Sequence, residues 1–363
     1  MAEHARVDAD PFLTPIRAFA GVRDHARPED RLRAGRRAAE AFREEMLSAP
    51  PVRYFRSASL VAAPYPTRYA FLDACALPFP LVHIENRVFV VQVERGGERR
   101  TLLLSPTDID EAKRTPFFAR LRDRAGPLAP QFEKIVARRT GDVVEQLARI
   151  GVRPDEVDYI SYDHLHTQDV RRWLGTRDRP GLFPRARLLV MRQEWESAHG
   201  LLPTQADWYC PGGVDGVDPA RVVLLDGDTR VGDSLALIHT PGHTEGNHSF
   251  VTRVAEGLFV TSENGVCVDA YAPRASRIPG LARHAEQTGA EVVLNGNTLE
   301  SSVEQYVSMV IEKTIAGPSE RHGDFPNMVV SSELAPFWGA PGIAPTFRFG
   351  EIELGEHVRA PGR

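Results

Sequence analysis

Apolar residues lie three or four positions apart near the start of the chain. Over 28–47 they recur between charged residues behind Pro28, and this spacing predicts an amphipathic helix. From 54 to 104 the pattern changes to short apolar and aromatic runs with a turn at Gly96-Gly97, which predicts a β-rich region with a hairpin. The chain is therefore expected to begin with a helix and continue into strands.

The second half of the chain is also rich in strand patterns. Helical spacing over 132–150 stops at Gly151, and a strand is expected at 157–162. A closing helix is expected where Ser301 and Glu304 form a capping-box pattern, and Gly317 stops it. Further strands are expected at 187–191, 221–225, 234–239, 248–252, 258–261 and 291–294.

Composition narrows the class of protein. Of 363 residues, 42% are hydrophobic and 26% are charged, as in ordinary globular proteins, and no apolar run approaches the roughly 20 residues of a membrane span. A net charge of -5 argues against nucleic acid as a partner. The N-terminus lacks a secretion-signal pattern, and the three cysteines form no CxxC pair, so we expect a cytoplasmic protein whose metal ligands are histidine and oxygen.

Three histidines carry the candidate chemistry. His164 and His166 directly follow the strand expected at 157–162, so both imidazoles can turn toward one divalent metal. His243 follows a second strand in a Pro-Gly turn. Three imidazole donors would leave a fourth position for water, the arrangement by which zinc lowers the pKa of bound water to about 7.

These motifs resemble the metallo-β-lactamase superfamily, whose signature is a strand followed by HxHxDH and later a TPGHTxG turn. The resemblance covers about 82–316, and the run from Pro184 to Trp195 is similar to lactonase-like members. It implies a four-layer αββα sandwich of the α/β (α+β) class, with a first metal site at His164, His166 and His243. We expect an N-terminal helical and β extension at 1–80, the metallo-β-lactamase domain at 81–317 and a C-terminal aromatic tail at 318–363, packed on the domain or on a partner subunit.

The second metal site of the family is altered in this chain. Gln168 stands where the family has its aspartate, and Asp169 stands where it has the next histidine. Glu263 matches the bridging carboxylate, and Asn297 replaces a final histidine. The resemblance thus implies one or two zinc ions, while an oxygen-rich second site built from these residues would suit manganese or iron.

Several roles remain open at this stage. A general base would be Asp169 or Glu263, because Gln168 cannot accept a proton; Asp169 equally suits a surface ion pair with its arginine neighbours. Asp163 is either a carboxylate that orients an imidazole or an ordinary turn residue. Tyr271 is either a pocket residue or a packed aromatic side chain.

Three functions are compatible with these residues. The first is a metallo-hydrolase that cleaves an ester-like bond (lactone, thioester or amide) of a small molecule by metal-bound hydroxide. The second is a mono- or dinuclear non-heme iron enzyme that handles dioxygen, and the third is a binding or scaffold protein that has lost catalysis. The expected partners are a small-molecule substrate and a second copy of the chain in a homodimer, with no nucleic acid and no membrane.

Overall fold

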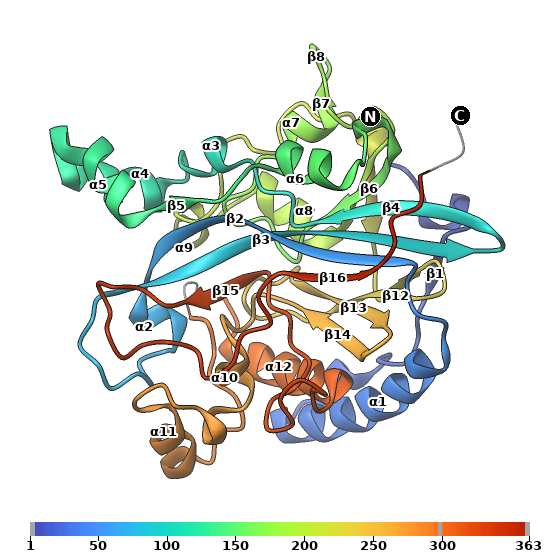
Figure 1. Ribbon diagram of the computed structural model, residues 1–363. Helices are drawn as coiled ribbons and strands as arrows, with labels where there is room; N and C mark the ends of the chain where they lie inside the picture. The colour runs from blue at the N-terminus through green and yellow to red at the C-terminus, as the bar shows by residue number, and fades with distance from the viewer. Residues whose placement is uncertain (1–3, 297–299, 360–363) are drawn as a thin grey trace.

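Two β-sheets pack face to face and helices cover their outer faces (Figure 1). A computed structural model describes residues 4–296 and 300–359 of the chain. α12 (Ser302–Ala316) and α1 (Pro28–Ser48) lie against the smaller sheet, and α8 (Arg192–His199) lies against the larger one. This arrangement confirms the predicted αββα sandwich.

The larger sheet combines a parallel half with an antiparallel half. Within the described residues its main path runs β10-β9-β6-β4-β3-β2-β16, and the pairs between β10 and β4 are parallel whereas those from β4 to β16 are antiparallel. The strands are β2 (Tyr54–Pro66), β3 (Leu81–Arg95), β4 (Glu98–Leu104), β6 (Val157–Ser161), β9 (Arg187–Met191), β10 (Val222–Leu225) and β16 (Ile352–Gly355), with β5 (Arg138–Arg139) paired to β2 and β15 (Ser332–Ala335) paired to β3.

The smaller sheet is antiparallel throughout and follows the order β1-β11-β12-β13-β14. Its strands are β1 (Leu13–Pro15), β11 (Thr229–Val231), β12 (Leu235–His239), β13 (His248–Val254) and β14 (Gly257–Thr261), and a separate hairpin joins β7 (Gly175–Thr176) to β8 (Arg179–Pro180).

The remaining helices are mostly short. They are α2 (Thr67–Ala70), α3 (Ile109–Ala112), α4 (Pro116–Ala125), α5 (Ala129–Val136), α6 (Val143–Ile150), α7 (Arg171–Leu174), α9 (Pro203–Ala206), α10 (Val268–Tyr271) and α11 (Leu281–Thr288). α4 and α5 protrude from one end of the sandwich (Figure 1). In the described part of the chain, no helix combines the length and the apolar character needed to cross a bilayer.

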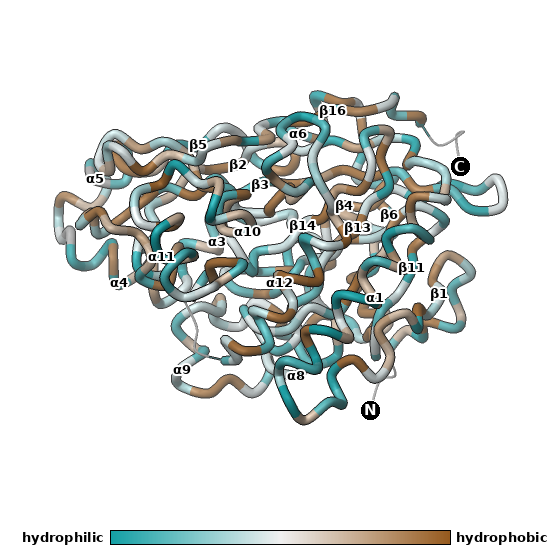
Figure 2. The backbone as a smooth tube through the Cα atoms, turned by 90° about the horizontal axis from the view of Figure 1, so that it is seen from below, coloured by the Kyte–Doolittle hydropathy of each residue, from teal (hydrophilic) through white to brown (hydrophobic). Residues whose placement is uncertain are grey.

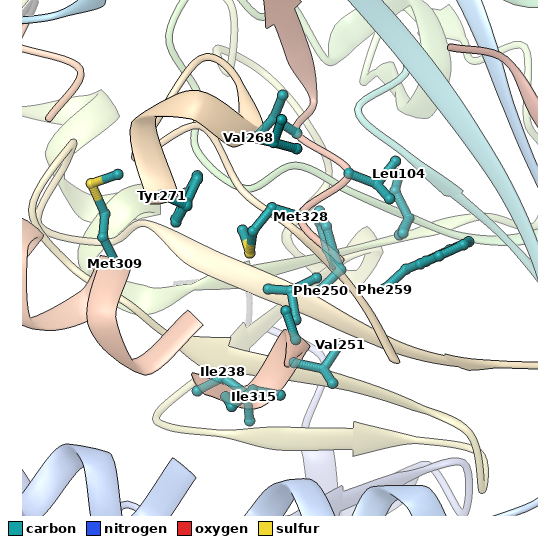
Figure 3. Close-up of a cluster of buried hydrophobic side chains, with 14 of the residues drawn as sticks. Leu104, Ile238, Phe250, Val251, Phe259, Val268, Tyr271, Met309, Ile315 and Met328 are labelled. Carbon is teal, nitrogen blue, oxygen red and sulfur yellow. The ribbon is translucent and has the colours of Figure 1, made fainter. Parts of the chain in front are cut away.

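The main core lies between the two sheets and beneath α12. Figure 3 shows buried side chains from both sheets and the helices that cover the smaller one. Phe55 of β2 meets Phe259 of β14 edge to face, with ring centroids 5.4 Å apart, so aromatic rings join the two sheets directly. Figure 2 shows α1 and α8 coloured largely as hydrophilic, which agrees with helices that expose one face to water.

Most predicted elements are confirmed, and the exceptions have physical causes. The expected strand at 291–294 is wrong: Val292, Val293 and Leu294 are buried, but the Val293 amide bonds to the Ala270 carbonyl rather than to a strand. The capping box at Ser301 is also wrong, because the Glu304 carboxylate pairs with arginines of the N-terminal segment. An apolar run indicates burial and a capping pattern indicates the start of a helix. Contacts with distant residues then decide whether a strand or a cap forms.

Both ends of the described chain contribute strands. β1 pairs with β11, while β15 and β16 pair with β3 and β2. Residues on both sides of each expected boundary share a sheet. The division of the chain after residues 80 and 317 stays a prediction.

The apolar face of α1 provides a test of this packing. Phe42 is 1% exposed and its ring lies 5.4 Å from that of Phe19. Because Phe42→Ala leaves a cavity, we expect it to lower the free energy of unfolding by about 3–5 kcal/mol. Glu44→Ala, on the exposed face of the same helix, should change it by less than about 0.5 kcal/mol. Chemical denaturation measures both, and equal effects would contradict the packing described.

Candidate metal centre

The three candidate histidines come from two loops that follow strands. β6 ends at Ser161, and the next turn carries His164 and His166. β12 ends at His239, and the following turn carries His243. The backbone amide of His248 donates to the carbonyl of Asp163 at 2.9 Å, so the two loops are joined beside the histidines.

The imidazole rings converge as predicted from the sequence. The ring centroid of His164 lies 4.6 Å from that of His166 and 4.5 Å from that of His243. One nitrogen from each ring lies within 4.8 Å of the others. Among the described residues, neither ring nitrogen of the buried His166 has a hydrogen-bond partner. A buried imidazole without a partner is costly unless an unseen ligand satisfies it, and this donor set fits a zinc ion.

The electrostatic environment separates His164 from the other two rings. Burial lowers the pKa of His166 and of His243 well below the usual value, and the neighbouring His164 lowers both further. Burial also disfavours the charged form of His164, but the Asp163 carboxylate outweighs it and raises the pKa of His164 to about 9. The Nδ1 atom of His164 lies 3.0 Å from Asp163 Oδ1. Asp163 thus has the orienting position considered for it from the sequence.

A single buried carboxylate joins the two histidine loops. Glu194 Oε1 accepts from the backbone amide of Leu165, between His164 and His166, at 2.7 Å, and from the Tyr209 hydroxyl at 2.9 Å. Its Oε2 accepts from the hydroxyl of Thr244, next to His243, at 2.6 Å. Glu194 therefore fixes both loops at once. In the sequence, Glu194 stands out only as part of the run that is similar to lactonase-like members, because a hydrogen bond between distant segments has no local pattern.

The turn that carries His243 is packed closely on both sides. A side-chain carbon at Gly242 would lie 2.2 Å from Gln305 Cα, and one at Gly246 would lie 2.2 Å from the Glu194 amide nitrogen. The His243 amide donates to Asn264 Oδ1 at 3.1 Å, and Asn264 in turn donates to the buried Glu312 of α12. The two glycines are required because the turn lies between α8 and α12.

Glu263 lies on the other side of His164. Together with Asp163 and His164 it forms a second group of ligand-type atoms within 4.8 Å of one another. Its Oε2 accepts from the hydroxyl of Ser332 at 3.1 Å, while Ser331 donates to Asp163. Burial raises the pKa of Glu263 to about 7, against the opposing effect of His164. Sequence reasoning missed both serines, since they lie beyond the region of resemblance.

Asp169 and Tyr271 are not brought into the histidine group. Asp169 accepts from the backbone amide and the guanidinium of Arg171, and its nearest ligand-type neighbours are Glu111 and Cys210. This is the ion pair considered as its alternative role. The hydroxyl of Tyr271 donates to Glu312 in the core at 2.8 Å. Gln168 does line the cavity beside the histidines, whereas Asn297 lies outside the described residues.

A mostly apolar cavity of about 190 Å³ opens beside the histidines. His164, His166, Gln168 and Glu263 are among its polar lining residues. The apolar walls come from β2, β3 and the helices α3 to α5, and include Val61, Ile84, Ile109, Phe118, Leu121 and Val136. Lys113 and Glu133, 2.5 Å apart, tie α5 to the chain after α3 along this wall.

Comparisons with known proteins agree with this fold. No family model matches the chain. The N-acyl homoserine lactonase AttM of Rhizobium johnstonii is 31% identical over 176 residues, which cover 41% of this chain and 62% of that protein. AttM of Azorhizobium caulinodans is 29% identical over 184 residues, which cover 44% of this chain and 65% of that protein. The matches thus span just under two thirds of these relatives.

A solved structure is similar over more of the chain. AidC, a dizinc quorum-quenching lactonase in complex with the product N-hexanoyl-L-homoserine, superposes with a TM-score of 0.51 and 10% identity, over 86% of this chain and 97% of that one. The chain is thus similar in sequence to N-acyl homoserine lactonases over part of its length, and it has the fold of AidC. This confirms the resemblance drawn from its histidine motifs.

Glu194 gives a test of how the two loops are held. Glu194→Ala removes the acceptor for Leu165, Tyr209 and Thr244, so the histidine loops lose their shared contact. We expect a loss of zinc affinity of about 10- to 100-fold, as for other groups that support metal ligands. Competition with a chelating dye measures it. Glu196→Ala, on the exposed face of the same helix, is the control, and equal affinities in the two variants would contradict the role of Glu194.

Proposed function

We propose that this protein is a metal-dependent hydrolase that opens the ring of a small lactone bearing an apolar acyl group. The observation that carries the proposal is the convergence of three imidazoles beside a mostly apolar cavity that His164 and His166 line. Among the described residues, the ring nitrogens of His166 have no hydrogen-bond partner. N-acyl homoserine lactones, which give the relatives their names, have this combination of a polar ring and an apolar chain.

The three histidines are the proposed ligands of one zinc ion. A zinc ion held there would supply Lewis acidity toward the lactone carbonyl and a lowered pKa for water. Asp163 bonds to the Nδ1 atom of His164 and orients that ring, and Glu194 joins the loop of His166 to the loop of His243. Glu263, which matches the family's bridging carboxylate, is the proposed further ligand or proton acceptor.

The reaction adds one water to the lactone carbonyl. The bond between the carbonyl carbon and the ring oxygen breaks, one proton of the water goes to the ring oxygen, and the product is a single hydroxy acid that carries both a carboxylic acid and an alcohol group. Glu263, which lines the cavity and lies beside His164, is the carboxylate proposed to carry this proton. The base role considered for Asp169 stays a prediction, and its ion pair with Arg171 speaks for the structural alternative.

Elemental analysis of the purified protein, followed by assay with a series of acyl lactones, tests the proposal. Zinc in the protein together with release of acid from a lactone would support it. Iron with uptake of oxygen would support the oxygen-handling alternative, and a metal-free, inactive protein would support the scaffold alternative.

Removal of one proposed ligand gives a sharper test. We expect His166→Ala to lose zinc and to lower kcat/KM for the best lactone at least about 1000-fold, because the metal supplies several kcal/mol of transition-state stabilisation. The fold should survive, since the ligand lies on a loop. Elemental analysis, kinetics and circular dichroism check these outcomes, with His25→Ala, an exposed histidine, as the control. Full activity of the His166→Ala variant without metal would contradict the proposal.

The cavity predicts a dependence on acyl-chain length. Leu121 of α4 lines the apolar wall, and Leu121→Trp would fill part of the space. We expect KM for long-chain acyl lactones to rise about tenfold, a change that corresponds to about 1.4 kcal/mol, while KM for a short-chain lactone stays within about twofold. Arg124→Ala, exposed on the same helix, is the matched control. A uniform effect on all chain lengths would show that the acyl group lies elsewhere.

A further inference from the structure

The segment after α12 reaches the candidate metal centre. Val329, Val330 and Ser331 lie directly before β15 and are buried. Two adjacent hydroxyls of this segment contact two carboxylates, because Ser331 donates to Asp163 and also lies 3.5 Å from Glu263 Oε2, while Ser332 donates to Glu263 at 3.1 Å. Since Asp163 bonds to the Nδ1 atom of His164, the serines contact the groups that surround the first histidine.

We infer that Ser331 and Ser332 are positioning residues of the metal centre, which makes the C-terminal segment part of the site. This inference rests on the proposed function only in so far as the histidines bind a metal. A carboxylate that bonds to a metal-bound imidazole must hold one orientation, and a hydroxyl on its second oxygen fixes that orientation. Ser331 does this for Asp163, and Ser332 restrains Glu263 beside it.

The serines are themselves held by a buried arginine of β3. Arg87 is 0% exposed. Its guanidinium donates to the carbonyls of Val330, at 2.5 Å, and of Gly350, at 2.8 Å, and its backbone amide donates to the Ser331 carbonyl at 3.1 Å. On the far side, the Leu334 amide donates to the carbonyl of Val266 at 2.7 Å. The backbone on both sides of the two hydroxyls is therefore fixed to the sandwich.

Zinc affinity of the folded, full-length protein tests the inference. Ser331→Ala, Ser332→Ala and the double variant are depleted of metal, then titrated with zinc against a chelating dye, and their cobalt-substituted forms are compared by absorption spectroscopy. Ser57→Ala is the matched control, because the Ser57 hydroxyl also bonds to the C-terminal segment, at the Gly350 carbonyl, without contact to either carboxylate. We expect the double variant to bind zinc at least tenfold more weakly, with an altered cobalt spectrum, and the control to stay within twofold.

A double-mutant cycle separates positioning from general stability. If Ser331 acts through Asp163, Ser331→Ala weakens zinc binding in the wild-type background and has no further effect on Asp163→Asn. Should the double serine variant fail to fold, the single variants carry the same comparison with Ser57→Ala.

The outcomes distinguish this inference from the proposed function. Serine variants that bind zinc as tightly as Ser57→Ala, or additive effects in the cycle, overturn the positioning role and leave the hydrolase proposal standing. A wild-type protein that binds zinc but opens no lactone overturns the hydrolase proposal and leaves the serine test valid. A wild-type protein that binds no metal overturns both.

Discussion

The carboxylate of Glu194 is the contact on which the geometry of the site depends. It bonds to the backbone between His164 and His166 and to the hydroxyl next to His243, so two loops from different sheets keep a fixed separation. Loops on their own are the mobile parts of a fold. Here a buried acceptor with three donors removes that mobility, because each loop that moved away would leave a buried polar group unsatisfied.

Each of the two sheets contributes one of the loops that carry the histidines. The larger core lies between the two sheets and beneath α12, and Asn264 and Glu312 there support the turn of His243. The parallel half of the larger sheet ends in the turn of His164 and His166. The apolar cavity extends away from this junction beneath α4 and α5, so polar and apolar parts of a ligand would lie on different elements.

Local patterns predicted the fold and the histidine trio well. Strand periodicity followed by a turn determines where His164, His166 and His243 appear, and the family resemblance places them together. The contacts that could not be predicted share a cause, because the contacts of Glu194, Ser331 and Ser332 depend on partners far away in the chain. Hydrogen bonds across such separations leave no periodic trace in a sequence.

The pairing of β16 with β2 has a consequence for biosynthesis. Ser57 and Ile352 are 295 positions apart in the chain, yet the Ile352 backbone amide donates to the Ser57 hydroxyl at the outer edge of the larger sheet. While the ribosome synthesises the residues between them, the part of the β2 edge that β16 later covers, residues 54–57, has no strand beside it, and an unpaired edge invites association with other nascent chains. The aromatic C-terminal segment thus covers a strand edge that chaperones would have to shield until this segment is synthesised.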